Sequence, residues 1–398
     1  MAKATADPSG LPFLLVDGHS KLQTSLMVRS VLPVWYMYPL YHGDGEPTMG
    51  LSYCPTIDAE ELQRRLRALL VPVSIADTGL ERRLACLELR YRIYAATCPV
   101  SLWAPGLILT NELVNQAERY LPVAEIARTF RRFSRLAMTG PAPSDPLVFH
   151  DATGWLPVLE RLGWPVADAN PAGLLRPLLT DRERRVALLF SLYLPERHGG
   201  GFSRYPCQLQ ALRDWLAVRS GQKGMVRCLD AACGTGEGTW DLAEALLATG
   251  LPRENIMITG LTLGALELFA AAHAFFPHDL ERQHAYRERI ASLVASGMSK
   301  RMLFRQADLM DCGDLGEGYS AILCNGLLGG PMLHDLVSVE RVVKGLAASL
   351  EPGGILMAAD RFHAGWRKLF PREQLAELFV RCGLRLMAGG EGIAGIRI

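Results

Sequence analysis

The stretch LDAACGTGEG, residues 229–238, decides the fold, because it joins an apolar run to a helical segment through a glycine-rich loop. The run Val226–Ala231 predicts a buried strand, and Glu237–Thr249 predicts a helix. Gly234 and Gly236 let the backbone turn tightly and let a ligand approach its amides. The loop is not the nicotinamide fingerprint, since Thr239 stands where that pattern requires glycine, and it lacks the lysine of a P-loop. It therefore predicts a ligand-binding strand–loop–helix unit of another kind.

Strands and helices continue to alternate after this loop. Five apolar runs separated by helical segments predict a parallel sheet, and two last runs around a Gly-rich turn predict a hairpin. The fold class is α/β, a Rossmann-like doubly wound sheet with a C-terminal antiparallel hairpin. The runs are Val226–Ala231, Ile256–Leu261, Met302–Ala307, Tyr319–Asn325, Ile355–Ala359, Leu384–Ala388 and Ile393–Ile398.

The part before this sheet is predicted to be mostly helical. Amphipathic runs follow an aromatic- and Pro-rich start, in which irregular or short extended structure is expected. Gly199–Gly201 is a plausible hinge. We therefore predict an N-terminal accessory, substrate or partner domain over residues 1–198 and a ligand-binding domain over 199–398. The predicted helices are an amphipathic run to Leu70 with a capping-box-like start at Asp58 and Glu61, and the segments Gly79–Ala96, Asn111–Leu121, Val123–Met138 and Asp181–Tyr193.

Composition and charge exclude several classes of protein. The 398 residues are 49% hydrophobic, with 42 Lys and Arg against 41 Asp and Glu, which argues against a nucleic-acid partner. None of the nine cysteines forms a CxxC pair, so we expect no metal. The apolar window Ile256–Phe276 contains Glu267 and His273 and reads as a strand and a helix, not a membrane span. Met1–Gly10 lacks signal-peptide character, so a cytoplasmic location is expected.

The segment Asp-Ala-Ala-Cys-Gly-Thr-Gly, residues 230–236, resembles the first motif of the class I S-adenosylmethionine-dependent methyltransferases. The resemblance covers about residues 225–398 and implies S-adenosyl-L-methionine as cofactor. It implies that the glycines pack against the methionine part of the cofactor, that an acidic residue after the third strand contacts the adenine, and that Asn325 lies beside the transferred methyl. The implied cofactor-binding residues are Asp230, Ala232, Gly234, Gly236, Asp308, Leu309 and Asn325.

The second strand departs from the family pattern. An acidic residue there grips both ribose hydroxyls in the family, but this sequence has Thr262. A hydroxyl cannot make the paired charge-assisted bonds of a carboxylate. The ribose is then bound more weakly, or it is held by another group such as Glu237.

A narrower resemblance points to the chemotaxis receptor methyltransferases, the CheR family. They share a glutamate directly after the Gly-x-Gly turn, matched by Glu237, and a Phe-Phe-Arg segment, which Phe202-Ser203-Arg204 is similar to. The resemblance assigns Arg204 to the carboxylate of the cofactor, a role that suits a planar guanidinium. The receptor-docking subdomain of that family has no counterpart, because Asp279–Ser296 reads as a helix.

These observations predict a methyltransferase that acts on a protein side chain or a small molecule. Methyl transfer requires mainly alignment of the nucleophile, the methyl group and the sulfur. Asn325 and His363 are the candidate catalytic residues, the histidine as a base for a hydroxyl or amine acceptor. The alternative is a catalytically degenerate regulatory module that still binds the cofactor.

Overall fold

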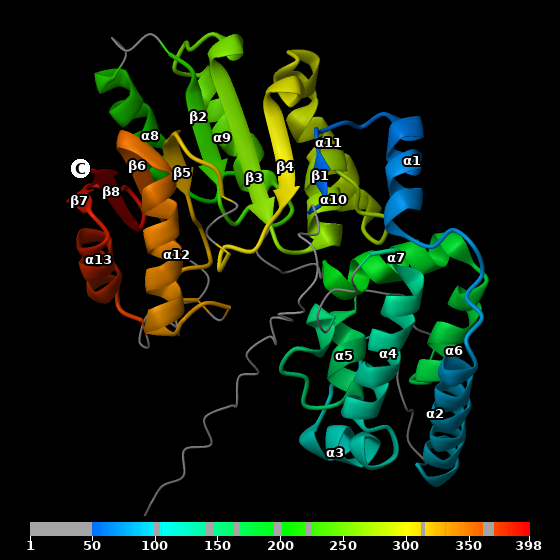
Figure 1. Ribbon diagram of the computed structural model, residues 1–398. Coiled ribbons are helices and arrows are strands. Elements are labelled where there is room, and N and C mark those ends of the chain that lie inside the picture. Colours follow the sequence, from blue (N-terminus) through cyan, green and yellow to red (C-terminus); the bar gives the residue numbers. More distant parts are fainter. Residues whose placement is uncertain are drawn as a thin grey trace, which may run out of the picture. The chain divides into compact units, whose positions relative to one another are not determined.

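The β-sheet contains eight strands in the order β1-β4-β3-β2-β5-β6-β8-β7 (Figure 1). The computed structural model describes residues 50–98, 104, 106–140, 146–162, 168–194, 201–219, 224–311, 315–330, 332–360 and 370–398. The strands are Ser52–Tyr53 (β1), Val226–Asp230 (β2), Ile256–Thr262 (β3), Met302–Gln306 (β4), Tyr319–Leu323 (β5), Leu350–Ala358 (β6), Leu384–Met387 (β7) and Ile393–Arg397 (β8).

Strand pairing confirms the predicted fold class. Strands β4, β3, β2, β5 and β6 pair in parallel, and β8 lies antiparallel between β6 and β7. The chain runs outward from β2 to β4 and then returns to β5 on the other side of β2. The strand order thus reverses between β2 and β5, which is where a doubly wound sheet binds its ligand.

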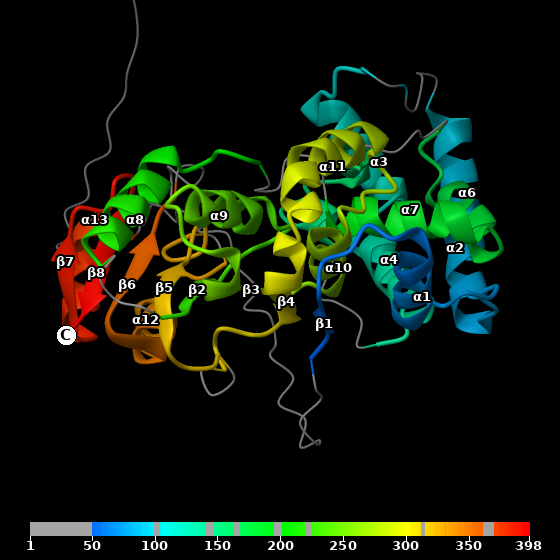
Figure 2. The same cartoon turned by 90° about the horizontal axis from the view of Figure 1, so that it is seen from above.

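Alternating side chains of the central strands fill two separate cores. Cys228 and Ile258 pack in the core that contains α8 to α11, whereas Leu229 and Leu261 pack in the core that contains α12 and α13. Burial on both faces explains the continuous apolar runs of these strands. Figure 2 shows α8, α9 and α11 on one face and α12 on the other. The helices are Pro206–Val218 (α8), Glu237–Leu247 (α9), Ala265–His273 (α10), Leu280–Ala295 (α11), Leu336–Ser349 (α12) and Arg372–Arg381 (α13).

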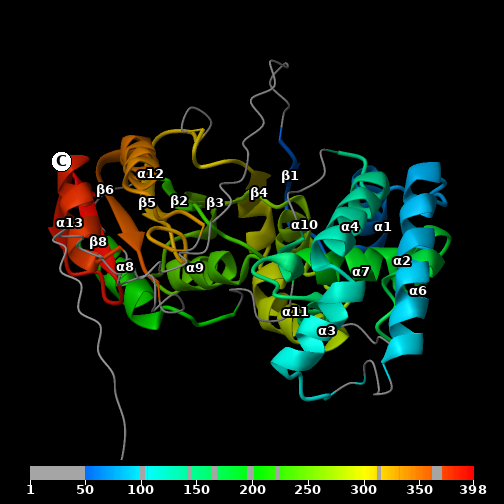
Figure 3. The ribbon, with the colours of Figure 1, turned by 90° about the horizontal axis from the view of Figure 1, so that it is seen from below.

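The first part of the described chain is mostly helical, as predicted (Figure 3). Aromatic side chains such as Phe130 and Trp155 fill its interior. The buried Arg185 donates to the carbonyl oxygens of Val71 and Val73 and so ties two segments together. The helices are Ala59–Leu69 (α1), Thr78–Thr97 (α2), Asn111–Tyr120 (α3), Val123–Ala137 (α4), Trp155–Arg161 (α5), Pro171–Leu175 (α6) and Arg182–Tyr193 (α7).

The organisation of the N-terminal part differs from the prediction at its start. Residues Ser52–Tyr53, which the sequence assigned to the helical domain, pair with β4 at the edge of the sheet. Gly45–Ile398 forms one compact unit. The division between residues 198 and 199 stays a prediction, because 195–200 lie outside the described residues, as do the first 49.

His273 at the end of α10 joins the segment after β1 to the sheet domain. It is fully buried between the rings of Tyr53 and Phe269, and its Nδ1 lies 2.8 Å from the carbonyl oxygen of Thr56. Its Nε2 has no hydrogen-bond partner in the part of the chain that the structure describes. Burial lowers the pKa of His273 to about 4, with Arg65 and Arg287 adding to the effect and Thr56 and Glu61 opposing it.

The lowered pKa predicts a stability loss in mild acid. The folded pKa lies below the unfolded value, so the stabilisation is present above pH 6.5 and is lost as the pH falls toward 4. The shift corresponds to at most about 3 kcal/mol of unfolding free energy. We expect His273→Phe, which keeps a ring but cannot titrate, to lose less stability than wild type between pH 6.5 and 4 in urea titrations. Equal losses in both proteins would contradict this role.

Candidate functional site

The glycine-rich loop turns the chain from β2 into α9. Gly234 and Gly236 have left-handed φ angles of 50° and 90°. An ideal Cβ on Gly236 would lie 2.8 Å from the Cβ of Ala271 and 3.0 Å from the hydroxyl of Tyr286, so the position requires glycine for space as well as conformation. An ideal Cβ on Gly234 would meet no atom within 4 Å, so the space beside it is open.

Asp230, the last residue of β2, is hydrogen-bonded to this loop and to α9. Its buried carboxylate accepts a 2.7 Å hydrogen bond from the hydroxyl of Thr239 and a further bond from the amide of Ala232. Burial raises the pKa of Asp230 to about 6, against the effect of these two donors. The side chain therefore orients the loop.

Glu237 lies in an ion pair at the start of α9. Its Oε1 lies 2.7 Å from Nη2 of Arg282, and its Oε2 accepts a 2.6 Å bond from the hydroxyl of Thr235. The guanidinium of Arg282 also donates to Thr235 and lies 4.2 Å from the ring centroid of Phe276. Tyr286, one helical turn further along α11, donates to the carbonyl oxygen of Thr235 at 2.9 Å. Glu237 thus links the loop to α11, and its role in cofactor binding stays a prediction.

The Phe202–Arg204 segment contacts α9 and α11. The amide of Ser203, at φ 56°, donates to Oδ2 of Asp241 at 2.5 Å. The ring of Phe202 packs against that of Tyr286 at 4.9 Å between centroids. Burial lowers the pKa of Arg204, an effect that the negative charges of Glu237 and Asp360 oppose. The guanidinium is thus within electrostatic range of Glu237, at the start of α9, and of Asp360, which follows β6.

Asn325 follows β5 and makes three hydrogen bonds. It exchanges two with the buried side chain of Gln208, at 2.9 and 2.8 Å, and its Oδ1 also accepts from the amide of Ala359 at 2.9 Å. The side-chain amide thus links α8 to the ends of β5 and β6. His363, the other candidate catalytic residue, lies outside the described residues.

Thr262 ends β3, and its hydroxyl donates to Oε2 of Glu267 at 2.6 Å. Glu267 is not among the ligand-binding residues expected from the sequence. Burial raises the pKa of this carboxyl group, against the effect of the Thr262 donor. The departure from the family pattern at Thr262 is therefore accompanied by a carboxylate within hydrogen-bond distance.

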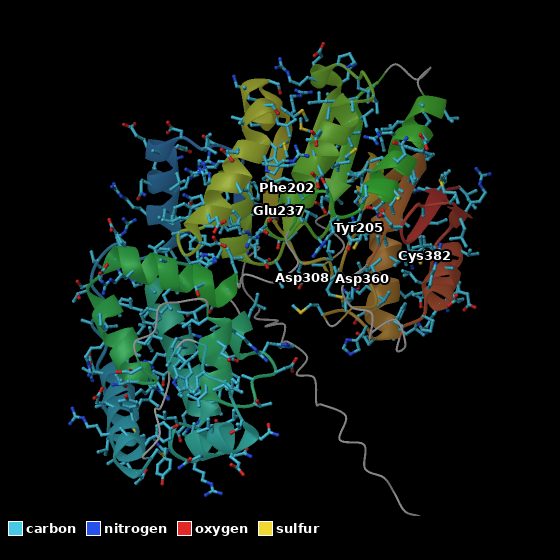
Figure 4. All side chains as sticks on the ribbon, turned by 180° about the vertical axis from the view of Figure 1, so that it is seen from behind. Phe202, Tyr205, Glu237, Asp308, Asp360 and Cys382 are labelled. Atoms are coloured by element: carbon cyan, nitrogen blue, oxygen red, sulfur yellow. The ribbon has the colours of Figure 1, made fainter. Side chains whose placement is uncertain are left out.

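The remaining predicted residues follow β2 and β4. Ala232 lies in the loop, Asp308 accepts from the amide of Met310 at 2.8 Å, and Leu309 is buried. Figure 4 labels Asp308, which follows β4, and Asp360, which follows β6, together with Glu237 and Tyr205.

The described residues contain neither a metal-binding cluster nor a membrane-spanning helix. No three His, Cys, Asp or Glu side chains among them are grouped to hold a metal ion. Over the same residues, every helix is too short or too polar to cross a membrane.

Comparison with known proteins relates part of the chain to methyltransferases. No protein-family model matches it. Over 233 residues, 55% of the chain, it is 24% identical to the probable biofilm formation methyltransferase WspC of Pseudomonas putida, of which the match covers 50%. It is 32% identical over 138 residues, 35% of the chain, to the protein syc1184_c of Synechococcus, of which 26% is covered. The chain spans half or less of the length of these two curated relatives.

Solved structures of methyltransferases are also similar to about half of the chain. CalS10, an amino pentose methyltransferase from Micromonospora echinaspora, is 17% identical with a TM-score of 0.33, and the match covers 50% of this chain and 93% of that one. The sugar N-methyltransferase KedS8 from Streptoalloteichus is 18% identical with a TM-score of 0.33, with 49% and 88% covered.

The resemblance to the class I S-adenosylmethionine-dependent methyltransferases is confirmed by the similarity to a methyltransferase, together with the strand order and the left-handed glycine loop. The structure adds Arg282, Tyr286, Gln208 and Glu267 to the residues expected from the sequence. Only Glu267 carried a local signal, since it stands five residues after Thr262 in the first turn of the next helix.

Proposed function

We propose that the protein is an S-adenosylmethionine-dependent methyltransferase that acts on a protein side chain or a small molecule. The observation that carries the proposal is the turn of Gly234 and Gly236 at the switch point of the sheet, with Arg204 in electrostatic range of Glu237 directly after it. A doubly wound sheet binds its ligand at this edge.

The residues at this edge fit the cofactor. The open space beside Gly234 leaves room for its methionine part, and Arg204 supplies a cation for the carboxylate of that part. Asp308 and Leu309 follow β4, at the place proposed for the adenine. Asp230 and Ala232 are proposed to shape the loop.

S-adenosylmethionine, when bound, supplies a methyl group on a positively charged sulfur. The protein has to align the acceptor, since displacement proceeds in line. Asn325, fixed by Gln208, is proposed to position groups beside the reacting atoms. A hydroxyl or amine acceptor also has to lose a proton, the role proposed for His363. The near-zero net charge of the chain favours an acceptor other than a nucleic acid, and a cytoplasmic location is proposed.

A methyl-transfer assay tests this function. The full chain is incubated with methyl-labelled S-adenosylmethionine and a cell extract, and label is followed in the macromolecular and small-molecule fractions. Label in the macromolecular fraction supports a protein acceptor, and label in the other fraction supports a small acceptor. Cofactor binding without transfer of label to either fraction would contradict the proposed enzymatic function.

That last outcome describes the second candidate, a regulatory module that binds the cofactor or its demethylated product. Thr262 is the observation that favours it, because a neutral hydroxyl replaces the expected carboxylate at the end of β3. In either case the helices before residue 199 are proposed to supply acceptor specificity or a partner surface.

The proposed role of Arg204 predicts a ligand-specific loss. Removing a hydrogen-bonded charge costs about 1.5–3 kcal/mol, so we expect Arg204→Met to weaken S-adenosylhomocysteine binding roughly 10- to 100-fold. Binding of 5′-methylthioadenosine, which lacks the carboxylate, should change little. Arg213→Met is the control, because Arg213 bonds Gln210 of its own helix. Equal weakening of both ligands would show that Arg204 acts on the fold and not on the carboxylate.

A further inference from the structure

The pair formed by Thr262 and Glu267 lies at the edge where the ligand is proposed to bind. Thr262 is the last residue of β3, and Glu267 lies in the first turn of α10. The 2.6 Å hydrogen bond from the Thr262 hydroxyl to Oε2 fixes the direction of the carboxylate. The adjoining loop is that of the glycines, since the amide of Cys233 donates to the carbonyl oxygen of Leu261 at 2.8 Å.

Glu267 combines partial exposure of the residue with desolvation of its carboxyl group. The residue is half-buried by area, yet the surrounding atoms raise the pKa of its carboxyl group. Its charge also acts on the buried thiol of Cys233, whose pKa is raised mainly by burial. Hydrogen bonds to a carboxylate that is crowded by protein atoms are only weakly screened by water.

Glu237, the other glutamate near the loop, is already bonded to the protein through both carboxylate oxygens. Both of its carboxylate oxygens are within 2.7 Å of protein partners, Arg282 and Thr235. The only side-chain hydrogen bond that Glu267 accepts from the described residues, by contrast, is the neutral one from Thr262 to Oε2. The carboxylate of Glu267 thus has no charged partner among the described side chains, whereas that of Glu237 is paired with Arg282.

We propose that Glu267, oriented by Thr262, accepts the hydrogen bonds of the two ribose hydroxyls of the nucleoside ligand. This inference rests on the proposed function, and it moves the ribose-binding carboxylate from the end of β3 to the first turn of α10. Thr262 is then a positioning residue. A carboxylate accepts two hydroxyls better than a neutral oxygen does, because charge-assisted bonds are shorter and stronger.

Glu267 could also serve only as a structural residue, as a cap at the start of α10. Its carboxylate accepts from the amide of Gly264 at the start of α10, which caps the helix. A cap alone would affect stability, but it would not distinguish ligands that differ only in their ribose hydroxyls. The test therefore compares two ligands on the same protein.

Calorimetric titration of the full chain with S-adenosylhomocysteine and with its 2′,3′-dideoxyribose analogue provides this comparison. We expect wild type to prefer the natural ligand roughly 10- to 100-fold. Glu267→Gln should reduce this preference about 10-fold, and Thr262→Asp in the same chain should restore it. Glu281→Gln is the matched control, because Glu281 is an exposed glutamate in the first turn of the next helix.

An unchanged preference in Glu267→Gln would overturn the inference and leave the proposed function standing. A wild type that binds neither ligand would overturn the proposed function as well. If Glu267→Gln does not fold, Thr262→Val serves in its place, since it leaves the carboxylate but removes its donor. A reduced preference there supports the inference, and an unchanged one overturns it.

Discussion

Replacement of Gly236 by alanine is expected to abolish binding of S-adenosylhomocysteine. The left-handed conformation at φ 90° costs a residue with a Cβ about 1–2 kcal/mol. The new methyl group would also lie 2.8 Å from the Cβ of Ala271 and 3.0 Å from the Tyr286 hydroxyl. Overpacking of this kind costs typically about 1–3 kcal/mol, and here it is relieved only by moving the loop off α10 and α11.

Gly250→Ala is the matched control for this substitution. Gly250 follows α9 with φ 80°, and a Cβ there would meet no atom within 4 Å. Alanine at position 250 has the same unfavourable backbone conformation as alanine at position 236 but no steric clash. The control should therefore lose about 1–2 kcal/mol of unfolding free energy and keep its ligand affinity. Chemical denaturation and calorimetric titration measure the two effects. A folded Gly236→Ala protein with the affinity of wild type would contradict the role of this glycine.

Replacement of Arg282 by methionine is expected to destabilise the glycine loop, because this α11 side chain bonds both Glu237 and Thr235. The variant leaves the carboxylate of Glu237, only 6% exposed, without its cation at 2.7 Å, and it removes a donor to Thr235. Loss of one partner of a buried ion pair costs about 3–5 kcal/mol, and we expect the lower end because the Arg282 side chain is 19% exposed. Ligand binding should weaken as well, since Thr235 lies inside the loop.

Two further variants separate the charge from the packing. In Arg282→Met combined with Glu237→Gln no uncompensated charge remains, so much of the lost stability should return. Arg64→Met removes an exposed ion pair with Glu61 on α1, and we expect little effect because such pairs contribute little. The melting temperature and the denaturation midpoint are the measurements. If the double variant is no more stable than Arg282→Met, loss of the ion pair does not explain the lower stability of Arg282→Met.

The sheet could be predicted because its signals are local. Each central strand is a short apolar run, and the runs at β2, β3, β4 and β5 begin within a residue of the observed strands. The two-residue strand β1 is too short to show a period and pairs with β4 only through the tertiary fold. The run predicted from Ile355 begins instead at Leu350, since the Pro-Gly-Gly turn lies within β6 as an irregularity of its pairing with β5.

The candidate site was predictable only where the residues that interact lie within one short segment of the sequence. The glycine loop meets this condition, since its conformation follows from the spacing of Gly234 and Gly236. The partner of Glu237 does not, because Arg282 stands 45 residues further along the chain. The partner of Asn325, Gln208, is separated from it by 117 residues. Such pairs are set by the packing of α11 and α8 on the sheet, and no local pattern records them.

Titration of the full chain with S-adenosylhomocysteine tests the central claim most directly, because it needs no knowledge of the acceptor. The structure predicts saturable one-to-one binding that is lost in Gly236→Ala and kept in Gly250→Ala. A folded wild-type protein that shows no binding of this ligand or of S-adenosylmethionine, with Thr262→Asp failing to create it, would contradict the claim.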